Sequence, residues 1–305
     1  MYILQSDRLR VDVSEPGVPP NTTTRFDRAG FVEEVVLDGI HRFCASEPRN
    51  LSHVSSGGRG ICNEYKSDAD VEAAVGDYFM KPGIGLLLKE ADGPYRFMNA
   101  YKVKPFSIDV TQEGGSILFV TQPEPCGGYA LRQEKRLTVD GNRLEMRIKL
   151  ENAGEKDFVG EEYCHNFISV NCMTLGPNYT LEFPDGKDRG YFPAEGEMLA
   201  IGNKFTFSGP LQRARMFTME AGEFTPKPRE KSRFLCKDIP WNEFEWIFKN
   251  DAEGAGAHVY EQINLSRVVL WAANHMLSTE SFHSIRLAPG ESDIWTRTWV
   301  FESYK

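Results

Sequence analysis

Alternation of hydrophobic and polar residues is the dominant pattern of this chain. The clearest case is residues 144–150, where every second residue is hydrophobic and the residues between are charged. Because successive side chains of a strand point to opposite faces, this period of two predicts a strand with one buried face. The turn signal Asp140-Gly141-Asn142 pairs it with residues 136–139 in a predicted hairpin.

Strand signals of this kind recur along the whole chain. A second hairpin is predicted at residues 31–37 and 41–43, on either side of Asp38-Gly39. Further strands are expected at residues 116–120, 205–207, 216–218, 244–248, 268–271 and 294–301. The main helical signal covers residues 67–75, with Ser67 as the expected N-cap.

These elements predict an all-β fold. The 27 glycines and 17 prolines supply the turns that many short strands require. No tandem repeat, Ser/Gly linker or break in composition divides the 305 residues. We therefore expect a single domain over residues 1–305, built of two large, mostly antiparallel sheets packed face to face.

Composition narrows the class of partner. Hydrophobic residues make up 41% of the chain and charged residues 26%, as in ordinary globular proteins. A net charge of −9 argues against nucleic acids and anionic membranes as partners. No apolar run is long enough to span a bilayer, the N-terminal residues lack a signal peptide pattern, and the six cysteines form no CxxC pair. We expect a cytoplasmic protein, monomeric or homodimeric, that acts on a small molecule.

The most informative polar segment is residues 161–167, Glu-Glu-Tyr-Cys-His-Asn-Phe. On a strand, Tyr163, His165 and Phe167 share one face, which predicts an imidazole flanked by aromatic rings. Such a group suits a sugar, which has apolar C–H faces and polar rims. The alternative is a structural histidine that bonds a neighbouring carbonyl. Cys164 points to the other face, which argues against a Cys–His dyad.

Glu280 is the second candidate for catalysis. Its sequence neighbours Met276, Leu277 and Phe282 are hydrophobic. Burial raises the pKa of a carboxyl group and makes it a better base near neutral pH. The alternative is an exposed loop glutamate. With His165 as acid and Glu280 as base, the chain would move protons on a sugar.

Further residues are candidate substrate contacts. Lys81, followed by Pro82-Gly83-Ile84-Gly85, is expected to bond sugar hydroxyls or a phosphate, or to belong to a plain turn. Asn63 and Glu64 either line a cleft or end a strand, and the same two interpretations apply to Arg25 and Asp27 before Gly30. The histidines lack metal-ligand spacing and no nucleophile elbow occurs, so neither a metal site nor an activated serine is expected. The predicted substrate contacts are Lys81, Asn63, Glu64, Tyr163, Asn166 and Trp271.

At these positions the chain resembles the galactose mutarotase-like (aldose 1-epimerase) superfamily. The resemblance lies in the hairpin at residues 30–39, the loop at 81–85, the motif Tyr163-Cys164-His165-Asn166-Phe167 after Asn152-Ala153-Gly154, and the tail from Glu280 through Pro289-Gly290-Glu291. It implies a β-supersandwich with a sugar cleft on one face and no cofactor. It also implies that His165 matches the family's acid, and that Glu280 matches its base after a shift of several residues.

Residues and resemblance together predict an aldose 1-epimerase-like isomerase. In this reaction a base removes the anomeric hydroxyl proton while an acid protonates the ring oxygen. Three alternatives stay open: a carbohydrate-binding protein of the same fold without catalysis, a sugar lyase or other isomerase, and a hexose-6-phosphate 1-epimerase. The last would need cationic residues along the cleft, with Lys81 the first candidate.

Overall fold

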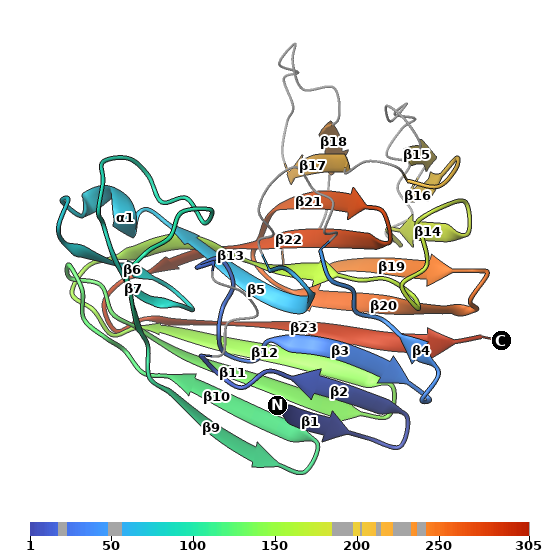
Figure 1. The fold of residues 1–305 in the computed structure, drawn as a ribbon, viewed down its shortest axis with the longest axis horizontal. Helices are drawn as coiled ribbons and strands as arrows, with labels where there is room; N and C mark the ends of the chain where they lie inside the picture. The colour runs from blue at the N-terminus through green and yellow to red at the C-terminus, as the bar shows by residue number, and fades with distance from the viewer. Residues whose placement is uncertain are drawn as a thin grey trace.

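The described residues form two ten-stranded sheets packed face to face, with a small third sheet at one end (Figure 1). This computed structural model describes residues 1–17, 23–47, 57–184, 198–201, 203–211, 215–221, 233–236 and 242–304. The first sheet has the order β1-β2-β3-β5-β13-β22-β21-β17-β18, with β4 paired to β3. Its strands are β1 (Tyr2–Gln5), β2 (Leu9–Val13), β3 (Val32–Leu37), β4 (His41–Arg42), β5 (Gly60–Ser67), β13 (Phe158–Phe167), β17 (Arg215–Ala221), β18 (Arg233–Cys236), β21 (Leu265–Ala273) and β22 (Met276–Leu287).

The second sheet has the order β15-β16-β14-β19-β20-β23-β12-β11-β10-β9. Its strands are β9 (Ile108–Glu113), β10 (Ser116–Thr121), β11 (Leu131–Asp140), β12 (Arg143–Asn152), β14 (Tyr179–Glu182), β15 (Met198–Ile201), β16 (Lys204–Phe207), β19 (Phe244–Asn250), β20 (Ala255–Gln262) and β23 (Ser292–Ser303). The small sheet contains β6 (Tyr78–Lys81), β7 (Gly85–Leu88) and β8 (Val103–Pro105). It lies at one end of the sandwich, where β6 contacts β5.

Both predicted hairpins are confirmed. β11 and β12 are antiparallel from the pair Asp140 and Arg143 at the turn to the pair Leu131 and Asn152. β3 pairs with β4 across Asp38 and Gly39, whose φ angles are 53° and 70°. Two consecutive positive φ angles are what a tight hairpin turn of this hand requires. The other predicted strands are found in β10, β16, β17, β19, β21 and β23.

The helix predicted at residues 67–75 is wrong in its length and its cap. α1 (Ala69–Glu72) is a single turn, and its N-cap is Asp68, which makes no side-chain capping bond. Only Ala69 and Asp70 of this helix are buried. Because a short helix depends on tertiary packing for its stability, so little buried surface does not sustain the second turn. The small sheet that follows was not predicted.

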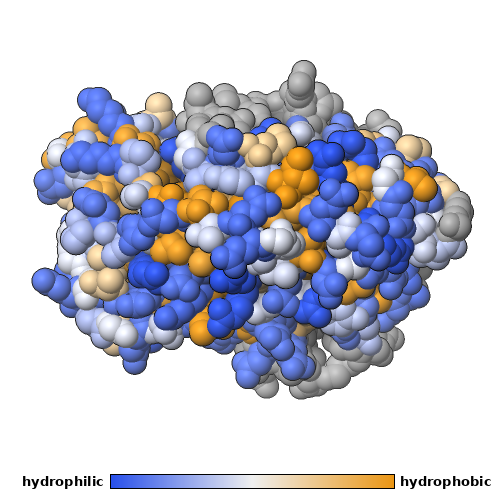
Figure 2. Space-filling view, turned by 90° about the horizontal axis from the view of Figure 1, so that it is seen from below, coloured by the Kyte–Doolittle hydropathy of each residue, from blue (hydrophilic) through white to orange (hydrophobic). Residues whose placement is uncertain are grey.

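The main core lies between the two large sheets. The alternating hydrophobic residues of β12 are all at most 1% exposed, and they pack with Trp295 and Trp299 of β23. Each such side chain stabilises the fold by about 1.5–3 kcal/mol when it is fully buried. Seen from below, the surface is mostly hydrophilic, and hydrophobic residues gather in a broken band across its middle (Figure 2).

The register of the first sheet brings distant segments together at its centre. β13 lies between β5 and β22, and Tyr163 pairs with Glu64 on one side and Phe282 on the other. Two residues further along β13, His165 pairs with Cys62 of β5, and on the other side it faces Glu280 of β22.

Candidate active site

The site lies on the outer face of the first sheet, the face turned away from the second sheet. Side chains alternate along β13, so Tyr163, His165 and Phe167 lie on this outer face while Cys164 belongs to the main core. On β22 the outer positions include Ser278 and Glu280. A strand pair therefore presents an imidazole beside a carboxylate.

His165 and Glu280 are in direct contact. The distance from His165 Nε2 to Glu280 Oε1 is 2.9 Å, and His165 Nδ1 lies 2.8 Å from Ser278 Oγ. His165 is 3% exposed and Glu280 is 7% exposed. Both ring nitrogens are thus engaged, and these two contacts fix the orientation of the imidazole. Ser278 was not predicted, although period-two counting back from Glu280 places it on the same face.

Aromatic rings surround the imidazole. The ring of His165 stacks on that of Phe167, with centroids 3.8 Å apart and planes 3° apart. Phe26 and Trp271 meet it edge-on, each with centroids 5.9 Å away. Trp271 is half-buried, and it lies beside His165 as one of the predicted contacts. Low polarity around the pair strengthens the electrostatic interaction between the two groups.

A cavity of about 590 Å³ opens next to this pair on the same side of the sheet. Tyr163 forms part of its wall, and the centroid of its ring lies 6.2 Å from that of His165. The other walls come from β5, α1, β6 and the segment 94–98. Its volume suits a monosaccharide. His165 and Glu280 do not line it. They form the next cross-strand pair on the same face, two residues along each strand from Tyr163 and Phe282.

Three polar side chains form the wall of the cavity nearest to the pair. Arg25 donates to Glu64 Oε2 at 2.7 Å and to Tyr163 Oη at 3.1 Å, and the Tyr163 hydroxyl donates to the same Glu64 oxygen. Burial by itself raises the pKa of the Glu64 carboxyl, but Arg25 and Lys81 lower it below its ordinary value. Glu64 is therefore an ionised acceptor at neutral pH.

Lys81 also lines the cavity, at 5% exposure. Its ammonium group donates to the backbone carbonyl of Tyr65, lies 3.9 Å from Glu64 Oε1, and lies 4.7 Å from the centroid of the Tyr95 ring. Burial lowers the pKa of Lys81 to about 8. Of the predicted contacts, Lys81, Glu64 and Tyr163 thus meet in one cavity.

Asn63 and Asn166 are placed differently from the other predicted contacts. Both are fully buried on the inner face of the sheet. Asn63 donates to Glu162 and accepts from Lys135, while Asn166 donates to the carbonyl of Thr279 and accepts from Trp299. Their alternation with outer-face neighbours explains this, because Glu64 and His165 occupy the outer positions. In this arrangement neither amide faces the cavity.

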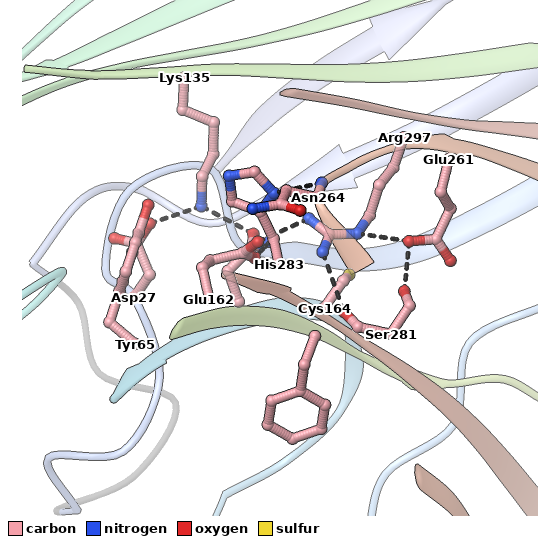
Figure 3. Close-up of polar contacts among 12 residues, drawn as sticks. Asp27, Tyr65, Lys135, Glu162, Cys164, Glu261, Asn264, Ser281, His283 and Arg297 are labelled. Atoms are coloured by element: carbon pink, nitrogen blue, oxygen red, sulfur yellow. Dashed lines mark hydrogen bonds and ion pairs between the residues drawn. The ribbon is translucent and has the colours of Figure 1, made fainter. Parts of the chain in front are cut away.

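Behind the site, a buried polar network joins the two sheets (Figure 3). Glu162 accepts from Arg297 at 2.8 Å, and Arg297 also donates to Glu261 at 2.9 Å. At the other end Lys135 donates to Asp27 at 2.6 Å. All five side chains are at most 2% exposed. No local pattern in the sequence predicts this network.

The Lys135–Asp27 contact fastens the segment that carries Arg25 and Phe26. Lys135 also donates to the carbonyl of Ala29, and the Asp27 backbone bonds Asn63. A Cβ at Gly30, whose φ is 61°, would lie 2.8 Å from Lys135 Cδ, so glycine leaves room for the lysine chain. Arg25 and Phe26 are thereby held over the outer face. Arg25 was considered from the sequence as a residue that either lines a cleft or ends a strand, and Phe26 was not considered.

Within the described part of the chain, no group of three or more His, Cys, Asp or Glu side chains is arranged to hold a metal ion. Nor does that part contain a helix long and apolar enough to cross a membrane.

Comparison with known proteins extends the description of the fold. The sequence matches no protein-family model and no curated protein. Solved structures do match. A galactose mutarotase related enzyme from Lactobacillus acidophilus is 11% identical with a TM-score of 0.56, over 100% of this chain and 98% of that one.

Two further matches agree with the first. A galactose mutarotase-like protein from Clostridium acetobutylicum is 10% identical with a TM-score of 0.54, over 98% of this chain and 100% of that one. A GalM/aldose epimerase homologue from C. elegans is 12% identical with a TM-score of 0.51, over 99% and 98% of the two chains. At these identities the likeness concerns the fold, and it confirms the fold expected from the sequence.

Proposed function

We propose that this chain, which has the galactose mutarotase-like fold, is an aldose 1-epimerase-like isomerase that interconverts the anomers of an aldose. The observation that carries the proposal is the 2.9 Å contact between His165 Nε2 and Glu280 Oε1, on the sheet face that borders the cavity. The ring oxygen and the anomeric hydroxyl oxygen of a sugar are both bonded to C1. An acid and a base that serve these two oxygens must lie side by side.

The proton balance assigns each residue its part. Glu280 as a carboxylate takes the proton of the anomeric hydroxyl while His165 as an imidazolium donates a proton to the ring oxygen. The bond between C1 and the ring oxygen breaks, and an open-chain aldehyde forms. Rotation about C1–C2 presents the other face of the aldehyde. Ring closure returns one proton to His165 and takes one from Glu280, so both residues end as they began.

The surrounding residues support these two roles. The imidazolium donates from Nδ1 to Ser278 Oγ, which holds Nε2 toward the reacting oxygens. The sugar enters from the cavity, contacts Tyr163, Glu64 and Trp271, and separates the direct contact between His165 and Glu280. A neutral imidazole and a carboxylic acid are formed during the open-chain stage, and the aromatic rings around them exclude water from the pair.

Exchange NMR between the α and β anomeric signals tests the proposal on a panel of aldoses and hexose phosphates. The protein should accelerate exchange for at least one sugar. His165→Asn and Glu280→Gln should each lower the acceleration roughly 10²–10⁴-fold, the contribution of a positioned acid or base.

The chain offers a matched control on its other sheet. His258 Nε2 lies 3.0 Å from Glu245 Oε2. This pair is partly exposed and does not line the cavity. His258→Asn and Glu245→Gln should leave the exchange rate unchanged. Absence of acceleration across the whole panel, or equal losses in both pairs of variants, would contradict the proposal.

A carbohydrate-binding protein without catalysis is the second candidate. It is favoured by one observation: His165 and Glu280 are nearly inaccessible and do not line the cavity. In that case Glu280→Gln would leave sugar affinity unchanged and the wild-type protein would not accelerate anomer exchange.

A further inference from the structure

The cavity beside Tyr163 carries more positive charge than its own carboxylates neutralise. Although the whole chain has a net charge of −9, cations outnumber acids in the cavity lining. The charged residues of the lining are Arg25, Lys66, Lys81 and Arg96 against Glu64, Asp68 and Asp70. Such a local reversal of sign favours a ligand with a negative charge.

Two of the three carboxylates of the lining already have partners. Glu64 forms ion pairs with both Arg25, at 2.7 Å, and Lys81, at 3.9 Å. Asp70 accepts a hydrogen bond from the backbone N–H of Tyr95. Lys66 and Arg96 form no ion pair with any carboxylate that the structure describes. The lining therefore keeps cationic groups that a ligand can satisfy.

The aromatic rings of the cavity argue against a cationic ligand. Lys81 lies 4.7 Å from the centroid of Tyr95, and Arg25 lies 4.6 Å from that of Phe97. Lys66 lies 5.2 Å from the centroid of Tyr163, whose ring also stacks on Phe282. Ring faces that would hold a ligand cation thus already hold the protein's own cations.

Lys81 is the most buried cation of the lining. An ammonium group has three N–H donors, and the hydrogen bond that the structure gives it goes to the carbonyl of Tyr65. Its low exposure raises the energetic cost of its charge, which the lowered pKa of about 8 reflects. An anion in the cavity would offset that cost.

We propose that the cavity binds the anionic group of the substrate, a carboxylate or a phosphate, through Lys66, Lys81 and Arg96. This inference rests on the proposed function and names its substrate class: an aldose that carries a negatively charged substituent. Arg25 is held by Glu64 and Tyr163, so it shapes the wall of the cavity and leaves the anion to the other three cations.

Calorimetric titration of the full chain with D-glucose, D-glucuronate and D-glucose 6-phosphate tests the inference. At low ionic strength at least one of the two anionic sugars should bind roughly tenfold or more tightly than D-glucose, as expected for a charge-assisted hydrogen bond. The preferred anion tells a carboxylate site from a phosphate site. Added salt should weaken the binding of the anionic sugar and leave that of D-glucose unchanged.

Two variants locate the charge that is responsible. Lys66→Met removes an exposed ammonium group and keeps most of the side chain, so folding is not at risk. It should reduce the preference for the anionic sugar about tenfold without changing the affinity for D-glucose. Lys81→Met should reduce the preference for the anionic sugar in the same way. Lys104→Met is the matched control, because Lys104 lies over an aromatic ring in the same way, 4.0 Å from the centroid of Tyr78, but outside the cavity.

Three outcomes would overturn the inference: binding of none of these sugars, D-glucose binding as tightly as its anionic relatives, or an equal effect of Lys66→Met and Lys104→Met. The proposed function fails separately. Anion-dependent binding that Lys66→Met abolishes, without any anomer exchange, would leave the anion site standing and remove the isomerase. Anomer exchange of a neutral aldose, without any preference for anionic sugars, would support the isomerase and remove the anion site.

Discussion

At the scale of single residues, Lys81 is a cationic side chain in a buried position that disfavours its charge. Its side chain is nearly buried between β5 and the segment that contains Tyr95, and its nearest carboxylate, that of Glu64, is shared with Arg25. Burial lowers its pKa from 10.5 to about 8. The folded protein therefore holds this proton less tightly than the unfolded chain does.

The lowered pKa of Lys81 has a consequence for stability. Between about pH 8 and 10.5 the unfolded chain binds more protons at this site, so the free energy of unfolding should rise with pH. The contribution amounts to at most about 1.4 kcal/mol per pH unit. Urea unfolding from pH 7 to 9.5 should show this rise in the wild type and its loss in Lys81→Met. In the exposed Lys104→Met control the curve should parallel the wild type, and a parallel curve for Lys81→Met would refute the argument.

At the scale of elements, the segment 23–31 is the piece that completes the site. Arg25 bonds Glu64 and Tyr163 on the outer face, and Phe26 packs edge-on against His165. Asp27 points the other way and bonds Lys135 of β11 in the second sheet. The segment is thus held from both sides of the first sheet.

Lys135→Met tests that attachment. It leaves the Asp27 carboxylate buried without its partner, which should lower the free energy of unfolding by about 3–5 kcal/mol. Lys149→Met on the neighbouring β12 removes an ammonium group 3.8 Å from Glu151 at the surface, and should cost less than about 1 kcal/mol. Chemical denaturation measures both. Similar losses in the two variants would show that the buried pair does not anchor the segment.

Most strands could be predicted because their alternation is a local property of the sequence. The hairpin of β11 and β12 needs only its turn and its period of two. The contact between His165 and Glu280 is different, because it depends on the register between β13 and β22. These strands are far apart in sequence: His165 and Ser278, which also contact each other, are separated by 113 residues. The residue types in the sequence identified His165 and Glu280 as candidates, but no local pattern predicted that β22 lies beside β13.

The predicted substrate contacts divide for the same reason. Glu64 and Tyr163 lie at outer positions and line the cavity, whereas Asn63 and Asn166 lie at inner ones. A polar residue next to a candidate site is on the wrong face of a strand as often as on the right one. Lys66 follows from outer-face counting along β5, and Arg25 was a candidate from its place before Gly30. No sequence pattern predicts how segment 23–31 folds over the sheet.

At the scale of the whole molecule, the two sheets are joined by a polar network as well as by the hydrophobic core. Arg297 of β23 bonds Glu162 of β13, so the strand that carries His165 is tied directly to the centre of the second sheet. At the edges, β1 pairs only with β2 and β9 only with β10 among the described strands, and the polar tie there is an exposed hydrogen bond from Gln112 of β9 to the carbonyl of Ile3 in β1.

Hydrogen exchange should follow this division. Backbone amides of β12, β13, β22 and β23 should be the last to exchange, because they open only with the global unfolding of the sandwich. Amides of β1 and β9 should exchange at least about tenfold faster, through local opening at the edges. Mass spectrometry of peptides after timed deuterium labelling measures both groups. Equal protection of edge and centre would contradict the ranking.

Phe26 and Asp27 are consecutive residues that serve opposite layers of the molecule. For protein engineering, residues 23–31 are therefore not an exchangeable module. A chimera that moves this segment into a relative must also supply a cation at the position equivalent to Lys135, which follows Asp27 by 108 residues in this chain. Without that cation, the transferred segment would place the Asp27 carboxylate, unpaired, in the interior of the recipient protein.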